Sequence, residues 1–407
     1  MPIDSNAELE RHADQYLQFL CDQLRTRQTG KADNRKATDF FSDTIEQLGF
    51  EVAKPRFECM DWSAGELSLR VDGEPVEAWI SPYSPGVELE APLAHISTLD
   101  ELKMQDLRGK ILLMTDELVK EQLMPKNFPF YNPEHHQEIT AVLEAKQPAA
   151  LLTATGKDPQ MAGGVYPFPV FEDGDFDIPS VYIKDVDGKR LAAHAGKTAT
   201  LLIDARRQPS YGFNVIARRG KADVPRLVFC AHIDAKAGTP GALDNASGVI
   251  TLLLLAERLK DYTGETPIEI TAINGEDYYA ASGEIEYLRS SLGPAEDVLL
   301  ALNIDGAGYL QGQTSYSFYG VPDDLTRSIQ ALFSGYPDLC EGQQWYQSDH
   351  SIFIQQAIPA MAYTSDQFDA LWSEIAHTPE DRPELVARKK LVDLSGALYE
   401  LVKLFNH

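Results

Sequence analysis

The sequence lacks the excess of basic residues that a polyanion-binding protein needs. It has 36 lysines and arginines against 62 aspartates and glutamates, which gives a formal net charge of −26. No stretch forms a basic patch, and this argues against nucleic acid or an anionic membrane as a partner. Two bound divalent ions would add four positive charges and leave −22. Most of the acidic residues are therefore expected on a solvated surface.

Cysteines and long apolar runs are also scarce. The four cysteines form no Cys-x-x-Cys pair, so neither a structural zinc site nor a disulfide framework is indicated; they are Cys21, Cys59, Cys230 and Cys340. No window approaches the run of about 18 apolar residues that a membrane span needs. Residues 1–20 lack the basic flank and apolar stretch of a secretory signal. The sequence therefore predicts a cytoplasmic location.

What the sequence does contain is the composition of a globular protein, with 43% hydrophobic and 24% charged residues. Its 407 residues favour two domains. Helices are predicted near the N-terminus, and short β-type segments separated by proline and glycine follow residue 49. We expect one domain made of residues 1–60 and 207–407, interrupted by a β-rich domain at residues 61–206.

Strands and helices alternate from residue 214 onward. The predicted strands are residues 214–218, 226–231, 268–273, 298–304 and 360–363. Such alternation predicts an α/β fold in which a mixed, mostly parallel sheet is sandwiched by helices. Open sheets of this kind place their functional sites where the strands end.

Five potential metal ligands lie at these strand ends or in nearby loops. They are His232, Asp244, Asp277, Asp305 and His377. Two imidazoles and several carboxylates that arrive from separate loops are the set a dinuclear metal site needs. The sequence therefore favours a metallohydrolase.

Each candidate also has an ordinary structural explanation. His232 and Asp234 point to the same side of a strand, so Asp234 could orient the imidazole, yet an isolated His-x-Asp is weak evidence. Asp244 would make an ordinary helix N-cap. Glu276 and Asp277 could be exposed turn acids; in the functional interpretation, one binds metal and the other removes a proton from water.

Taken in order, these motifs resemble those of the M28 family of co-catalytic metallopeptidases. The motifs are His232-x-Asp234, Pro240-Gly241-Ala242-x-Asp244-Asn245-Ala246-Ser247-Gly248, Gly275-Glu276-Asp277, Asn303-x-Asp305, Ser348-Asp349-His350 and His377-Thr378-x-x-Asp381. The resemblance implies the zinc-peptidase/phosphorylase-like fold. The insertion, with residues 106–111 and 178–181, is similar to a protease-associated (PA) domain.

The resemblance also implies how the ligands are shared. His232 and Asp305 would bind one divalent metal ion, Asp277 and His377 would bind the other, and Asp244 would bridge the two. The ions are expected to be Zn²⁺, with Co²⁺ or Mn²⁺ as alternatives. The family usually has glutamate at the position of Asp277, so this ligand is one methylene shorter.

Further roles follow from the same resemblance. Asp234 would support the metal-binding histidine, and Glu276 would act as the general base toward a water that bridges the metals. His350 would donate a hydrogen bond to the tetrahedral oxyanion. The peptide bond between Asp244 and Asn245 is expected to be cis.

The expected activity is that of an aminopeptidase acting on peptide substrates, since no arginine cluster that would bind a terminal carboxylate stands beside the motifs. Three alternatives stay open: a carboxypeptidase of the same family, a glutaminyl-cyclase-like transferase with a single zinc, and a non-catalytic receptor-like protein. Outside the site motifs, His135 and His136 match no helical zinc motif and are expected in a solvated loop.

Overall fold

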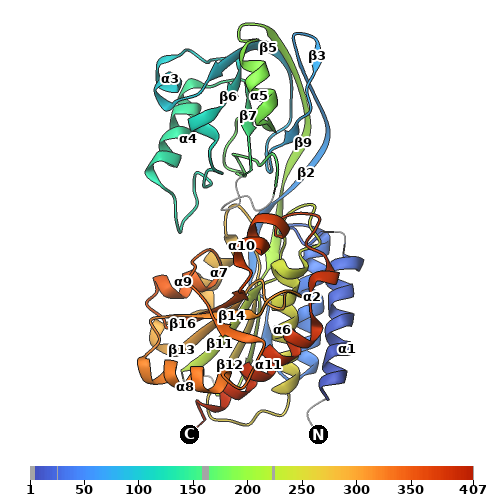
Figure 1. The fold of residues 1–407 in the computed structure, drawn as a ribbon, viewed down its shortest axis with the longest axis vertical. Coiled ribbons are helices and arrows are strands. Elements are labelled where there is room, and N and C mark those ends of the chain that lie inside the picture. The colour runs from blue at the N-terminus through green and yellow to red at the C-terminus, as the bar shows by residue number, and fades with distance from the viewer. Residues whose placement is uncertain (1–4, 25, 158–164, 222–224, 407) are drawn as a thin grey trace. The chain divides into compact units, whose positions relative to one another are not determined.

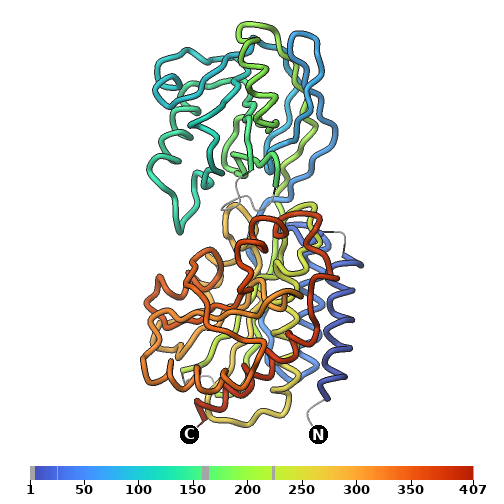
Figure 2. The backbone as a smooth tube through the Cα atoms, viewed as in Figure 1, coloured from blue at the N-terminus to red at the C-terminus, as the bar shows by residue number. Residues whose placement is uncertain are grey.

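The chain folds into two units, one of which interrupts the other (Figures 1 and 2). The computed structural model describes residues 5–24, 26–157, 165–221 and 225–406. The main unit contains residues 1–59 and 211–407, and the inserted unit contains residues 60–210. The boundaries expected from the sequence differ from these by one and four residues.

The main unit is built on an eight-stranded sheet with the order β1-β10-β12-β11-β13-β16-β14-β15. The strands are β1 (Glu51–Ala53), β10 (Val215–Arg219), β11 (Arg226–His232), β12 (Ile268–Ile273), β13 (Val298–Ile304), β14 (Thr314–Tyr319), β15 (Leu339–Glu341) and β16 (Ala360–Ser365). The four central strands β12, β11, β13 and β16 are parallel. Strands β1, β10 and β14 pair antiparallel with their inner neighbours, which confirms the predicted mixed sheet.

Helices cover this sheet on both faces. They are α1 (Asn6–Leu17), α2 (Ala32–Gln47), α6 (Ser247–Arg258), α7 (Ser282–Ser290), α8 (Asp323–Phe333), α9 (His350–Gln355), α10 (Phe368–Ala370) and α11 (Arg388–Lys403). Short 3₁₀ or π turns are η1 (Gln18–Gln23), η3 (Ala242–Ala246), η4 (Ala295–Asp297), η5 (Leu371–Ile375) and η6 (Pro383–Leu385).

The two faces of the sheet meet different helices because side chains alternate along a strand. Leu227 and Phe229 of β11 lie in the main hydrophobic core with residues of α1, α2, α6 and α11. On β12, Ile268 and Ile270 belong to the same core, whereas Glu269 between them points to the other face and accepts a hydrogen bond from the Tyr287 hydroxyl of α7. Strands β11 and β12 are buried along almost their whole length, as expected for parallel strands covered on both sides.

The inserted unit has its own eight-stranded sheet, in the order β3-β2-β9-β5-β6-β7-β8-β4. Its strands are β2 (Arg56–Val71), β3 (Glu74–Pro75), β4 (Trp79–Ile80), β5 (Val87–Ile96), β6 (Ile111–Met114), β7 (Ala150–Thr155), β8 (Ser180–Lys184) and β9 (Thr198–Phe213). Its helices are α3 (Leu99–Met104), η2 (Asp116–Val119), α4 (Glu134–Lys146) and α5 (Asp185–Ala192). Two hydrophobic clusters fill this unit.

Within the part of the chain that the structure describes, no helix is both long and apolar enough to cross a bilayer.

Candidate metal centre

The five predicted ligands come together at one edge of the main sheet. His232 is the last residue of β11, Asp305 directly follows β13, and Asp277 lies in the loop after β12. These three strands are parallel neighbours, so their carboxyl ends meet at the same edge. Asp244 lies in η3 before α6, and His377 lies in the loop after η5.

Asp244 occupies the middle of the cluster. Its Oδ1 lies 3.1 Å from Nε2 of His232, and its Oδ2 lies 3.1 Å from Nε2 of His377. On the outer sides, Oδ1 of Asp305 is 3.6 Å from the His232 nitrogen, and Oδ1 of Asp277 is 3.2 Å from the His377 nitrogen. The site therefore consists of two donor trios that share one carboxylate.

The donor atoms are buried and mostly lack ordinary partners. His232, Asp244 and Asp305 expose at most 1% of their surface. Among the described residues, several buried atoms of the five predicted ligands have no hydrogen-bond partner, namely His232 Nδ1 and Nε2, Asp244 Oδ2, Asp277 Oδ2 and Asp305 Oδ1. Each buried unpaired polar atom costs about 1–3 kcal/mol. Nitrogen and carboxylate donors in this arrangement fit metal ions such as zinc.

The charges of the site favour bound cations. Burial alone would lower the pKa of His377, but the carboxylates of Asp277 and Asp244 raise it to about 10. For His232, carboxylates including Glu276 likewise overcome burial and hold the pKa well above its usual value. Burial would raise the pKa of Asp244, but the two histidines hold it well below its usual range. The same field that retains protons on the imidazoles attracts divalent ions.

Glu276 lies at the rim of this cluster. One of its carboxylate oxygens forms a close group with donor atoms of His232 and Asp277, all within 4.8 Å of one another. Burial, together with the negative charges of Asp277 and Asp305, raises the pKa of Glu276 well above its usual value, although His232 opposes this. The adjacent acids Glu276 and Asp277 are thus inside the site and are not exposed turn residues.

Asp234 joins two of the loops that carry the ligands. It accepts hydrogen bonds from the backbone N–H of Gly275 at 2.8 Å, the backbone N–H of Asp277 at 3.1 Å and the hydroxyl of Thr29 at 2.9 Å. Its Oδ1 is 3.7 Å from Nδ1 of His232, which exceeds hydrogen-bond range. Asp234 therefore mainly fixes the loop that carries Glu276 and Asp277, and its predicted support of the His232 imidazole is secondary.

Asp381 holds the shared Asp244 residue from the other side. It accepts hydrogen bonds from the backbone N–H groups of Leu243 at 2.7 Å and Asp244 at 3.0 Å. The bond between Asp244 and Asn245 is cis, as the family resemblance implied. Asp244 is thus not an ordinary N-cap, because its side chain faces the two histidines and makes no capping bond to α6.

Arg27 is a buried residue for which the sequence predicted no role. Its guanidinium donates to four backbone carbonyl oxygens, at 2.7–3.1 Å, of Leu20, Ile233, Pro240 and Gly241. These bonds tie η1 to both ends of the loop between His232 and Asp244. Its position next to the N-terminal helices was visible in the sequence. Its partners could not be predicted, because every residue type carries a backbone carbonyl oxygen.

His350 does not fit its predicted role as an oxyanion donor. It is fully buried, and burial lowers its pKa to about 4, so the ring is neutral and carries one N–H. Nε2 lies 2.7 Å from the carbonyl oxygen of Trp345, which accepts that N–H. Nδ1 faces the amide nitrogen of Asn303 at 3.4 Å. No hydrogen of the ring is left for a substrate, and the assignment is wrong for this reason.

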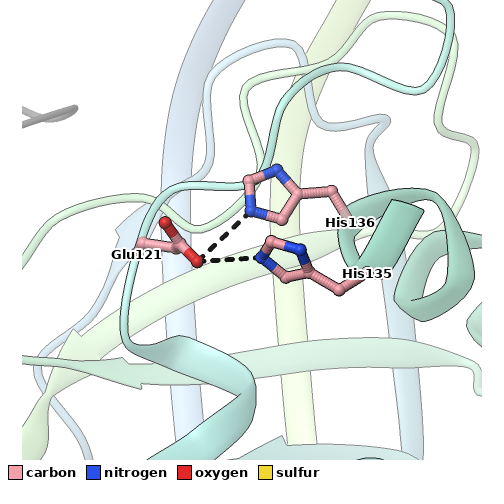
Figure 3. A group of neighbouring side chains, drawn as sticks. All are labelled: Glu121, His135 and His136. Atoms are coloured by element: carbon pink, nitrogen blue, oxygen red, sulfur yellow. Dashed lines mark hydrogen bonds and ion pairs between the residues drawn. The ribbon is translucent and has the colours of Figure 1, made fainter. Parts of the chain in front are cut away.

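A second histidine cluster lies in the inserted unit (Figure 3). His135 and His136 are in the first turn of α4, not in the solvated loop that we predicted, and both rings point toward Glu121. The backbone N–H of Met124 donates to Nδ1 of His136 at 3.0 Å, so the neutral ring carries its proton on Nε2. That nitrogen faces Glu121 at 3.4 Å. A protonated Nε2 cannot bind a metal, and we therefore assign no ion to this cluster.

A mixed α/β sheet whose strand ends hold two histidines around a shared carboxylate is the architecture of a metallohydrolase. Residues 214–402 match Peptidase family M28. This match confirms the resemblance of the motifs to that family and the enzyme class that they indicated.

Similar proteins are named as aminopeptidases. The chain is 25% identical to probable leucine aminopeptidase 2 of Aspergillus fumigatus, over 83% of this chain and 67% of that protein. It is 24% identical to aminopeptidase YwaD of Bacillus subtilis, over 98% of this chain and 87% of that protein. Among solved structures, a zinc aminopeptidase from Bacillus subtilis superposes with a TM-score of 0.75 at 22% identity, covering 96% of this chain and 95% of that one.

Proposed function

We propose that this protein is a two-metal aminopeptidase that removes N-terminal residues from peptides. The observation that carries the proposal is the position of Asp244, whose two oxygens each lie 3.1 Å from a different histidine. A carboxylate in this position can bridge two ions. The aminopeptidases named among the relatives support the same activity.

The two ions would be held as the family resemblance implied. His232 and Asp305 would bind one, Asp277 and His377 would bind the other, and Asp244 would bind both. Zinc is the proposed metal, in agreement with the zinc aminopeptidase of similar fold and with the nitrogen and oxygen donors. When bound, such ions polarise the scissile carbonyl and make water a stronger nucleophile.

Glu276 is proposed as the general base. It is an acid of the site that the ligand assignment leaves unused, and its carboxylate reaches within 4.8 Å of donor atoms in His232 and Asp277. Glu276 would accept a proton from the attacking water and deliver it to the leaving amine, as a general base and then a general acid. Asp234 would keep Glu276 in place through its bonds to Gly275 and Asp277.

The inserted unit is proposed to be a PA-like domain. Its eight-stranded sheet and its position between β1 and β10 support this interpretation. The proposed ligands and the proposed base all belong to the main unit, so no catalytic group is assigned to the inserted one.

A panel of blocked and free peptides tests the proposal. We expect the zinc-loaded protein to release N-terminal residues from peptides with a free amine and to leave N-acetylated peptides intact. Treatment with a chelator should abolish turnover, and added Zn²⁺ should restore it. Shortening of blocked peptides from the C-terminus would identify a carboxypeptidase instead, and cyclisation of N-terminal glutamine would identify a cyclase.

Glu276→Gln is the matched variant for this assay, since glutamine keeps the size of the side chain but cannot accept the proton. We expect kcat to fall by about 10²–10⁴-fold, while the zinc content remains that of the native protein. Full activity of this variant would refute the assignment of the base without affecting the assignment of the ligands.

A further inference from the structure

Lys236 places a positive charge beside one of the proposed metal ligands. It lies in the loop between β11 and η3, four residues after His232. Its Nζ is 3.8 Å from Oδ1 of Asp277. The same oxygen faces Nε2 of His377 at 3.2 Å. Any cation that binds this oxygen therefore lies close to the Lys236 ammonium group.

The loop that carries Lys236 is held firmly against the loop that carries Asp277. Arg27 donates to the carbonyl oxygens of Ile233, Pro240 and Gly241, which flank Lys236 on both sides. Asp234, two residues before Lys236, accepts the backbone N–H of Asp277 at 3.1 Å. These bonds hold the backbone on both sides of Lys236 and at Asp277, which keeps the two residues close together.

The two donor trios therefore differ in their surroundings. In the first trio, His232, Asp244 and Asp305 are almost completely buried, and the partners within 4.0 Å of the His232 ring are carboxylates. In the second, the His377 side chain is 20% exposed, and Asp277 meets the Lys236 ammonium. Among these contacts, only the second trio is reached by solvent and lies beside a positively charged group.

We infer that Lys236 weakens metal binding at the His377 and Asp277 position and so makes it the more readily exchanged half of the site. The inference rests on the proposed two-metal function. Its cause is Coulomb repulsion between the ammonium and a divalent ion on the same carboxylate oxygen. Even in a water-like dielectric, charges of one and two a few ångströms apart repel enough to change a binding constant about tenfold.

Isothermal titration of the full-length, chelator-treated protein with Zn²⁺ tests this. We expect two binding steps, with Lys236→Met tightening the weaker step by about tenfold or more and leaving the tighter step unchanged. Lys236→Gln should behave like Lys236→Met, and Lys236→Arg, which keeps the charge, should bind as the native protein does. His377→Ala should remove the weaker step.

Lys36→Met is the matched control. Lys36 also contacts an aspartate, at 2.7 Å from Oδ1 of Asp33, but its side chain is exposed on α2, and among the described ion pairs it meets none of the five ligands; its removal should leave both steps unchanged. Two steps in the native protein with no tightening in Lys236→Met and Lys236→Gln, or loss of the tighter step in His377→Ala, would overturn this inference alone. A native protein that binds fewer than two ions would overturn the proposed two-metal function together with it.

Discussion

Asp244 organises the site at the scale of single residues. Its side chain is the contact between two histidines that are 145 positions apart in the sequence, His232 and His377. The residue type and the neighbouring motif predicted a bridging carboxylate. The contact that orients the Asp244 carboxylate could not be predicted. Asp381 fixes the backbone of Asp244, and these two residues lie far apart in the chain.

Arg27 gives a prediction at the same scale. Replacing it with methionine keeps much of the side-chain volume but removes the donors to four buried carbonyl oxygens. Hydrogen bonds from a charged group contribute about 1.5–3 kcal/mol, and unpaired acceptors add a penalty. We expect the free energy of unfolding of the main unit to fall by about 2–4 kcal/mol in urea denaturation.

Arg289→Met provides the comparison for this measurement. The Arg289 side chain is 71% exposed and pairs only with Glu286 three residues earlier among the described ion pairs. Surface pairs of this kind contribute about 0–1 kcal/mol. An Arg27→Met protein no less stable than Arg289→Met would show that the hydrogen bonds from Arg27 to the four carbonyl oxygens do not stabilise the fold.

At the scale of elements, the central parallel strands were the most predictable part. An unbroken apolar run such as residues 227–231 of β11 has one interpretation once helices alternate with the strands. Helix α4 (Glu134–Lys146) was less predictable. Its first turn follows a proline-rich stretch, and we therefore expected His135 and His136 in a loop. In the structure His136 is buried in the first turn of the helix, where it accepts the backbone N–H of Met124 and lies 3.4 Å from Glu121.

Helix α4 carries a pH-dependent prediction. Burial lowers the pKa of His136 below its ordinary value of 6.5. As the pH falls below 6.5, the unfolded chain binds a proton that the folded chain takes up only at lower pH, so acid favours unfolding. We expect the unfolding temperature of the inserted unit to fall between pH 7.5 and pH 5.5, and to fall less in His136→Gln. Equal slopes in both proteins would contradict this account.

The whole molecule consists of two units with separate cores. The main unit has one large hydrophobic cluster, and the inserted unit has two smaller ones. All five proposed ligands belong to the main unit. A ligand that binds only the folded form stabilises it by about 2.7 kcal/mol at 100 times its Kd. Zinc should therefore stabilise one unit directly.

Differential scanning calorimetry tests this at the scale of the molecule. We expect two unfolding transitions. Chelation should lower the temperature of the main-unit transition, and it should leave that of the inserted unit in place. The His377→Ala protein should show a smaller difference between the zinc-loaded and chelated states. A single transition that shifts as a whole would mean that the two units unfold cooperatively.

The sequence by itself determined the family, the parallel core of the main sheet and the identity of the five candidate ligands, because strand-end motifs and residue chemistry are local. Only the tertiary structure decided the rest. It gave the His350 ring a carbonyl partner, placed Lys236 against Asp277 and buried Arg27 among backbone oxygens. These contacts join residues from separate parts of the chain. Their distances and partners depend on how the loops pack, and no spacing in the sequence encodes that.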